Sequence, residues 1–192
     1  MIHSAKQLLS FSLCYKALQK LADGGLRKTF VDDYVKPKQH EKILDLGCGT
    51  GNLYPYISKY DVEYLGIDIN TRYIKHAKKA YNTECFECED VANLQLEYSF
   101  DKIICSSLLH HLSDRKFSDM LEEASKRLTP NGTFISIDPL YHENQTVLSY
   151  LMCKLDRGDY VRTRGEYYRL LSEHFKSVKF TFLGKISNVP TD

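Results

Sequence analysis

Residues 42–51 read Lys-Ile-Leu-Asp-Leu-Gly-Cys-Gly-Thr-Gly, and this stretch decides the fold. Its first half, 42–46, is a short apolar run with the length of a buried strand. The run leads directly into a turn in which Gly47, Gly49 and Gly51 allow left-handed backbone and the close approach of another group. The order strand, glycine turn, helix is typical of open α/β folds that bind a ligand beside the strand.

The alternation of strand and helix continues along the chain. Apolar runs predict further strands, and apolar residues spaced by three and four predict the helices between them. Strands separated by helices pair in parallel through right-handed crossovers, which predicts a doubly wound, mostly parallel, Rossmann-like α/β sheet. The predicted strands are 42–46, 62–67, 83–88, 100–105, 133–137 and 178–183. The predicted helices are an N-terminal addition at 4–22, one ending near Tyr34, one capped by Asn70 with Tyr73, Ile74, Ala77 and Tyr81 on one face, one along 117–128, one at 143–155 and one opened by a Thr163–Glu166 capping box.

Composition and charge exclude several classes of protein. Lysine and arginine number 26 and aspartate and glutamate 25, so the net charge of +1 offers no strong nucleic-acid signal. No apolar run approaches the ~18–20 residues of a membrane span, and no signal-peptide pattern is present, so we expect a cytoplasmic protein. The six cysteines, including the Cys85-x-x-Cys88 pair, are expected to be reduced packing thiols with no metal site.

Polar residues gather where the predicted strands end. Ligands of open α/β sheets bind outside the carboxyl ends of the strands, so these residues are expected to face one site. In chain order they are Asp45 with the glycine turn, Asp68, Asp90, the group Ser106, His110 and His111, and Asp138.

The glycine turn admits two kinds of ligand. A dinucleotide fingerprint also places a glycine turn before a helix and an acid about 20 residues later, but its glycines stand at relative positions of about 1, 3 and 6. Here Asn52 occupies the last of these positions. Asp45 would also repel a pyrophosphate, so a ligand with a cationic group is favoured. A nicotinamide-dependent oxidoreductase stays as a less favoured alternative.

With these motifs the chain resembles the class I S-adenosylmethionine-dependent methyltransferases. The resemblance covers roughly residues 40–140, and the motifs occur in family order. The motifs are Ile-Leu-Asp-Leu-Gly-Cys-Gly-Thr-Gly at 43–51, Tyr-Leu-Gly-Ile-Asp-Ile-Asn at 64–70, Asp90-Val91, Ser-Ser-Leu-Leu-His-His-Leu at 106–112 and Arg-Leu-Thr-Pro-Asn-Gly-Thr at 127–133. The stretches 138–141 and 157–163 are similar to those of a bacterial small-molecule subgroup linked with glycan or lipid pathways.

The resemblance implies a role for each motif residue. Asp45 would face the methionine ammonium, Asp68 would accept from both ribose hydroxyls, and Ile69 would pack on the adenine. Asp90 would take the adenine amino group, and Ser106 would border the methionine end. The implied cofactor-binding residues are Asp45, Gly47, Cys48, Gly49, Gly51, Asp68, Ile69, Asp90, Val91 and Ser106.

Several of these residues also have a purely structural interpretation. Asp68 and Asp90 can each cap the segment that follows them. His110 or His111 can simply pack or cap the next helix. The arginines between 157 and 169 could receive an anionic acceptor, but neighbouring acids nearly balance them, which favours a solvated face.

The resemblance also divides the single expected domain. We expect a helical N-terminal cap at 1–36, a cofactor-binding core at 40–138, a helical acceptor-side segment at 139–175, and the last strand with a tail at 177–192. The antiparallel strand that closes this family's sheet is expected to be short or missing, because few residues follow Leu183.

The expected function is direct in-line transfer of a methyl group from S-adenosyl-L-methionine to a small-molecule acceptor, with S-adenosyl-L-homocysteine as product. Catalysis then needs mainly proximity and water exclusion, with a base only when the acceptor loses a proton. Histidine, with a usual pKa near ~6.5, is the suitable base, and of His110 and His111 we favour His111. The acceptor pocket is expected between the N-terminal helix, these histidines and 138–165. A non-catalytic or partner-dependent cofactor-binding protein stays as an alternative, and the sequence leaves the acceptor and the oligomeric state open.

Overall fold

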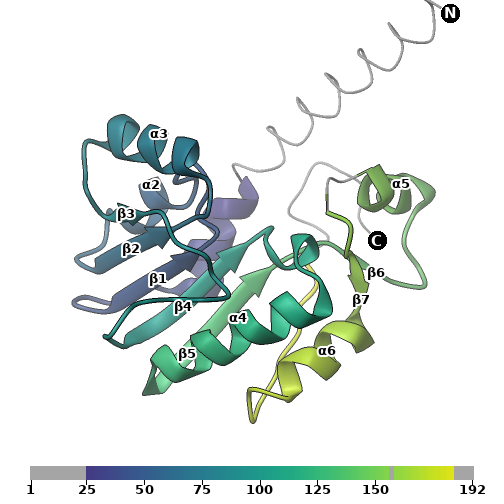
Figure 1. Ribbon diagram of the computed structural model, residues 1–192. Helices are drawn as coiled ribbons and strands as arrows, with labels where there is room; N and C mark the ends of the chain where they lie inside the picture. Colours follow the sequence, from purple (N-terminus) through teal and green to yellow (C-terminus); the bar gives the residue numbers. More distant parts are fainter. Residues whose placement is uncertain (1–24, 156–157, 184–192) are drawn as a thin grey trace, which may run out of the picture.

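The computed structural model describes residues 25–155 and 158–183 of the chain. Its centre is a five-stranded sheet in the order β3-β2-β1-β4-β5, in which every neighbouring pair is parallel (Figure 1). A separate parallel pair, β6 and β7, lies beside this sheet. The doubly wound, mostly parallel sheet predicted from the sequence is therefore confirmed, and the described residues contain no antiparallel pair.

The elements alternate along the chain as the sequence predicts. None of the described helices is long and apolar enough to cross a membrane. The strands are β1 (Lys42–Leu46), β2 (Glu63–Ile67), β3 (Phe86–Glu87), β4 (Phe100–Ser106), β5 (Leu128–Ile137), β6 (Leu140–Tyr141) and β7 (Arg162–Thr163). The helices are η1 (Phe30–Val35), α2 (Tyr54–Ile57), α3 (Thr71–Tyr81), η2 (Leu109–His111), α4 (Asp114–Arg127), α5 (Val147–Leu155) and α6 (Arg164–Ser172).

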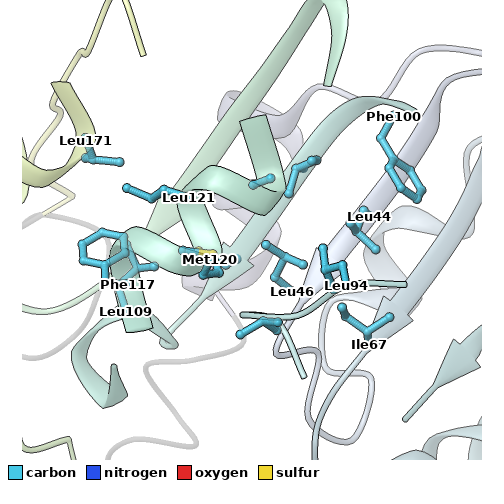
Figure 2. Packing of buried hydrophobic residues seen from close by; sticks show 14 of the residues in the cluster. Leu44, Leu46, Ile67, Leu94, Phe100, Leu109, Phe117, Met120, Leu121 and Leu171 are labelled. Carbon is cyan, nitrogen blue, oxygen red and sulfur yellow. The ribbon is translucent and has the colours of Figure 1, made fainter. Parts of the chain in front are cut away.

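Strand β1 lies in the middle of the sheet and is buried on both faces. Leu44 and Leu46 share one hydrophobic cluster with Phe117 of α4, as Figure 2 shows. Ile43 belongs to a second cluster with Phe30 of η1. Burial on both sides explains why the consecutive residues Ile43 and Leu44, which point to opposite faces of the sheet, are both apolar.

Parallel pairing brings the carboxyl ends of the strands to one edge of the sheet. Leu46 pairs with Ile67 of β2 and with Cys105 of β4, and Ser106 pairs with Ile137 of β5. The residues that follow these four strands therefore leave the sheet side by side.

Side-chain caps set the starts of three helices. Asn70 caps α3 by accepting from the backbone N–H of Arg72 at 3.0 Å. Ser113 caps α4, and the Thr163–Glu166 capping box opens α6, as predicted. The residues predicted to share one face of α3 are buried to different degrees, because Ile74 and Ala77 are buried while Tyr73 is 45% exposed.

The predicted last strand, 178–183, is absent: these residues form no strand. Val178 and Phe180 instead pack on the main hydrophobic cluster, and Phe175 stacks on Phe134 of β5 with ring centroids 5.4 Å apart. The segment is held by its side chains without a backbone ladder, so that β5 is an edge of the described sheet.

Other predicted elements have different bounds. The strand expected at 83–88 is only two residues long as β3, and the helix expected at 143–155 begins at Val147. Strand β5 begins at Leu128, before the expected 133, with a register shift opposite Phe100 and Lys102. The helix predicted at 4–22 lies outside the described residues.

Candidate active site

The three glycines of the turn after β1 have left-handed backbone but different neighbours. Their φ angles are 67° at Gly47, 57° at Gly49 and 78° at Gly51. A Cβ on Gly47 would lie 2.8 Å from the side chain of Leu108, and a Cβ on Gly51 would lie 2.8 Å from that of Tyr81. A Cβ on Gly49 would have no neighbour nearer than 4.0 Å. Gly47 and Gly51 thus serve internal packing, and Gly49 presents its backbone to open space.

Asp68 ties the glycine turn to the end of β2. One carboxylate oxygen accepts from the backbone N–H of Gly49 at 3.0 Å, and the other accepts from that of Asn70 at 2.8 Å. Each oxygen has a second lone pair for a further donor. The next residue, Ile69, is 69% exposed although it is apolar, so the carboxylate stands beside an uncovered hydrophobic surface.

Asp45 is a buried carboxyl group within β1. It is 1% exposed and accepts from the hydroxyl of Tyr64 at 2.7 Å. Burial raises its pKa from 3.8 to about 7, the Tyr64 hydrogen bond lowers it, and the negative charge of Asp68 raises it further. A carboxyl group in this state favours the approach of a cation, which would stabilise its ionised form.

The remaining candidate cofactor residues differ in how much of each residue faces the rim of the sheet. The side chain of Cys48 is buried with Ile74 and Phe86, and burial raises the pKa of its thiol, so only its backbone borders the turn. Asp90 accepts from the backbone N–H of Ala92 at 3.0 Å, which is the capping interaction of the structural alternative. Val91 is buried in the main cluster, and Ser106 ends β4 half-buried.

A histidine–carboxylate pair stands where β4 and β5 end. Nδ1 of His110 lies 2.7 Å from Oδ1 of Asp138, and the two side chains are 2% and 5% exposed. Burial raises the pKa of Asp138, while the contact with His110 lowers it. With Asp138 ionised, Nδ1 of His110 carries the proton and donates a hydrogen bond to the carboxylate. Oδ2 of Asp138 is also buried, and it has no hydrogen-bond partner within the described ranges.

His111 follows His110 but has a different environment. It is exposed, and its ring centroid lies 4.2 Å from that of His110 at an interplanar angle of 40°. The preceding loop contains Ser107, whose φ of 56° is unusual for a residue with a side chain. The backbone is therefore strained directly beside the histidine pair.

Sequence reasoning missed two features of this site. It gave Asp138 a place at the edge of the sheet without pairing it with His110. It also assigned Arg162 to a solvated face, which was wrong, because Arg162 is 4% exposed and donates to the carbonyl oxygen of Leu109 in the histidine loop, residues 107–112. A sequence that alternates acids and bases gives no signal of such burial.

The candidate site is therefore one rim of the sheet with two halves. The glycine turn, Asp68 and Ile69 form one half, and His110 with Asp138 forms the other. The side chain of Leu108 connects them, because it packs against Gly47.

A pocket of about 410 Å³ lies elsewhere. Among its lining residues are Lys42, Glu63 and Phe100, which begin β1, β2 and β4. It is therefore at the opposite edge of the sheet and does not belong to the candidate site.

The crowded surroundings of Gly51 and the open surroundings of Gly49 predict different losses of stability when each is replaced by alanine. Gly51→Ala should lower the free energy of unfolding by about 2–4 kcal/mol, because its Cβ would overlap Tyr81 and its φ would be strained. Gly49→Ala should cost only about 1 kcal/mol, for the strained φ alone. Urea denaturation measures both. Equal losses would contradict the open surroundings of Gly49.

Asp45 should make folding stability depend on pH. The pKa of Asp45 is about 7 in the folded state and 3.8 in the unfolded state, so the native state binds this proton more tightly. The free energy of unfolding therefore falls as the pH rises from about 4 to about 7. Asp45→Asn should therefore stabilise the chain by about 2–4 kcal/mol at pH 8 and by little near pH 4. Urea denaturation at the two pH values checks this, and a gain independent of pH would contradict it.

Comparison with known proteins agrees with this geometry. Residues 43–132 match a family model described as a methyltransferase domain. The chain is 26% identical over 125 residues to a ubiquinone biosynthesis O-methyltransferase of Idiomarina loihiensis, covering 62% of this chain and 49% of that protein. It is 29% identical over 102 residues to the cyclopropane-fatty-acyl-phospholipid synthase of Escherichia coli, covering 49% of this chain and 25% of that protein.

A solved structure extends the likeness across the fold. Human N-acetylserotonin methyltransferase in complex with SAM superposes with a TM-score of 0.71 at 26% identity, over 90% of this chain and 52% of that one. The chain spans about half the length, or less, of the curated relatives it matches here. The matched motif region, these relatives and the shared sheet show that the chain belongs to the class I S-adenosylmethionine-dependent methyltransferase family.

Proposed function

We propose that this chain transfers the methyl group of S-adenosylmethionine to a small molecule whose acceptor atom loses a proton. The observation that carries this proposal is the pairing, at one edge of the sheet, of an open glycine turn with a buried histidine–carboxylate pair. The turn suits a cofactor, and the pair suits the removal of a proton. The methyltransferase family supports this reading over the nicotinamide alternative.

The residues at the rim fit S-adenosylmethionine. A Cβ on Gly49 would fill the open space at the turn, and the remaining lone pairs of Asp68 can accept from ribose hydroxyls. The exposed Ile69 offers an apolar surface to an adenine ring. The buried Asp45 suits the ammonium group, whose charge would compensate the desolvated carboxylate.

The other candidate residues have more limited roles. Asp90 and Val91 would contact the adenine edge, with Val91 using its backbone N–H because its side chain lies in the core. Cys48 would contribute backbone only. Ser106 would border the methionine end.

His110 is the proposed base, in place of His111. S-Adenosylmethionine supplies an activated methyl group on its sulfonium. His110 accepts the acceptor's proton at Nε2, and Asp138 holds the ring through Nδ1 and stabilises the imidazolium that forms. The near-complete burial of both side chains excludes water from the proton transfer.

The acceptor class follows from this chemistry. A base is needed where the nucleophile is a weakly acidic hydroxyl, and methyl transfer to an amine that is already neutral does not require one before attack. Two similar proteins are named as an O-methyltransferase of ubiquinone biosynthesis and an N-acetylserotonin methyltransferase. We therefore propose a small hydroxylated acceptor, phenolic in character.

A direct assay tests the function. The chain is incubated with S-adenosylmethionine and, one at a time, a catechol, a hydroxyindole, a primary amine and vesicles of unsaturated phospholipid. S-Adenosylhomocysteine formed in each reaction is measured by mass spectrometry. Turnover with a hydroxylated aromatic compound supports the proposal, and turnover only with the amine or the vesicles would contradict the acceptor class.

Cofactor affinity should depend on Asp68. Asp68→Ala removes hydrogen bonds to a charged acceptor, worth about 1.5–3 kcal/mol each, so the affinity for S-adenosylhomocysteine should fall tenfold or more. Asp61→Ala is the matched control, because Asp61 is exposed and precedes β2 at the other edge of the sheet. Calorimetric titration gives both dissociation constants. If the Asp68 variant binds as the control does, the cofactor lies elsewhere.

Turnover should depend on His110 and not on His111. With the acceptor found above, His110→Gln should lower kcat by about 10²–10⁴-fold at saturating cofactor, because the general base is lost. His111→Gln should stay near the wild-type rate, and both variants should bind S-adenosylhomocysteine normally. Full turnover of the His110 variant would show that this histidine is structural.

A second candidate is a partner-dependent member of the family. The observation that favours it is that no strand of the described residues pairs with the outer edge of β5, since an edge strand is a template for another strand. S-Adenosylhomocysteine binding without turnover on any acceptor of the panel would favour this candidate.

A further inference from the structure

Arg162 of β7 bonds to the loop that carries the two histidines. Its guanidinium group has five N–H donors, and five hydrogen bonds use them. They reach the carbonyl oxygens of Leu109, Leu112 and Tyr160 and, twice, one carboxylate oxygen of Asp114, at 2.6–3.0 Å. Leu109 and Leu112 flank the two histidines, so Arg162 fixes the backbone on both sides of them.

The surroundings of Arg162 require an arginine. The side chain is 4% exposed, and its guanidinium carbon lies 5.2 Å from the ring centroid of Phe117 and 5.8 Å from that of Tyr167. A planar guanidinium fits between rings while donating within its own plane. A lysine ammonium has three donors and cannot reproduce this pattern.

The segment before Arg162 touches His110 directly. The backbone N–H of Tyr160 donates to the carbonyl oxygen of His110 at 3.0 Å. A Cβ on Gly158 would lie 2.1 Å from Cδ2 of the His110 ring and 2.6 Å from its carbonyl oxygen. These separations are too short for any side chain, so His110 rests against bare backbone at Gly158.

We propose that Gly158 and Arg162 are positioning residues that hold the His110 ring in its hydrogen bond with Asp138. Gly158 limits the ring from one side, and Asp138 holds it from another. Arg162 fixes the loop that carries it. An alanine at Gly158 would push the ring away, and a displacement of about 1 Å breaks a bond of 2.7 Å between Nδ1 and Oδ1. The effect on turnover rests on the proposed function, but the effect on the hydrogen bond does not.

Nuclear magnetic resonance of the imidazole Nδ1 proton tests the hydrogen bond without any acceptor. The His110 signal is identified as the one that disappears in His110→Gln and in Asp138→Asn. Gly158→Ala should abolish it, whereas the matched control Gly165→Ala should keep it, because a Cβ at Gly165 meets nothing within 4 Å. Retention of the signal in a folded Gly158→Ala protein would overturn the proposal for Gly158.

A second pair of variants tests Arg162. Arg162→Lys should also abolish the signal, whereas Arg169→Lys should keep it, because Arg169 is 57% exposed although it too contacts Asp114. Circular dichroism establishes that each variant is folded. A folded Arg162→Lys protein that keeps the signal would overturn the proposal for Arg162.

Turnover separates this proposal from the proposed function. Gly158→Ala and Arg162→Lys should each lower kcat by up to about 10²-fold, as misplacement of a catalytic group does, and leave the affinity for S-adenosylhomocysteine within twofold. Loss of the signal with undiminished turnover would support positioning of His110 while overturning its role as base. Loss of the signal together with kcat supports both.

Discussion

The candidate site depends on the two hydrogen bonds that the carboxylate of Asp68 accepts. By accepting from the backbone of Gly49 and of Asn70, it joins the turn after β1 to the start of α3. Two segments distant in sequence thereby become one rigid rim, and Asn70 in turn caps the helix. The buried β1 below supplies the fixed support, because both of its faces lie in hydrophobic clusters. A charged group thus organises the turn, and apolar packing holds it in place.

Much of the fold and half of the site could be predicted from the sequence. The residues at 42–46 and the glycines after them predict a buried strand that enters a left-handed turn, and the structure has both. The caps at Asn70 and Thr163 are local interactions, so their residue types predict them. The segment 178–183 was predicted as a strand from its apolar residues. Pairing depends on a neighbouring backbone, and apolar residues alone do not supply one.

The second half of the site could not be predicted, because it depends on contacts between distant segments. His110 meets Asp138 across 28 residues and Arg162 bonds to Leu109 across 53. Nothing in the local sequence distinguishes this arginine from its solvated neighbours. The choice between His110 and His111 could not be tested by spacing either, since Asp138, the carboxylate that contacts only one of them in the described residues, follows the distant strand β5. Local patterns therefore predict the glycine-turn half of the candidate site better than the histidine half.

The contact of Leu108 with Gly47 has a thermodynamic consequence. The two halves of the rim meet in this packing interaction, in which even a methyl group on the glycine would come within 2.8 Å of the leucine. A ligand that shifts the turn therefore also shifts the loop that carries the histidines. Linkage requires the coupling to be reciprocal, so whatever free energy one ligand adds to the binding of the other is returned in equal measure. Coupling between two ligands at such a site needs no moving domain, only a leucine side chain packed against a glycine.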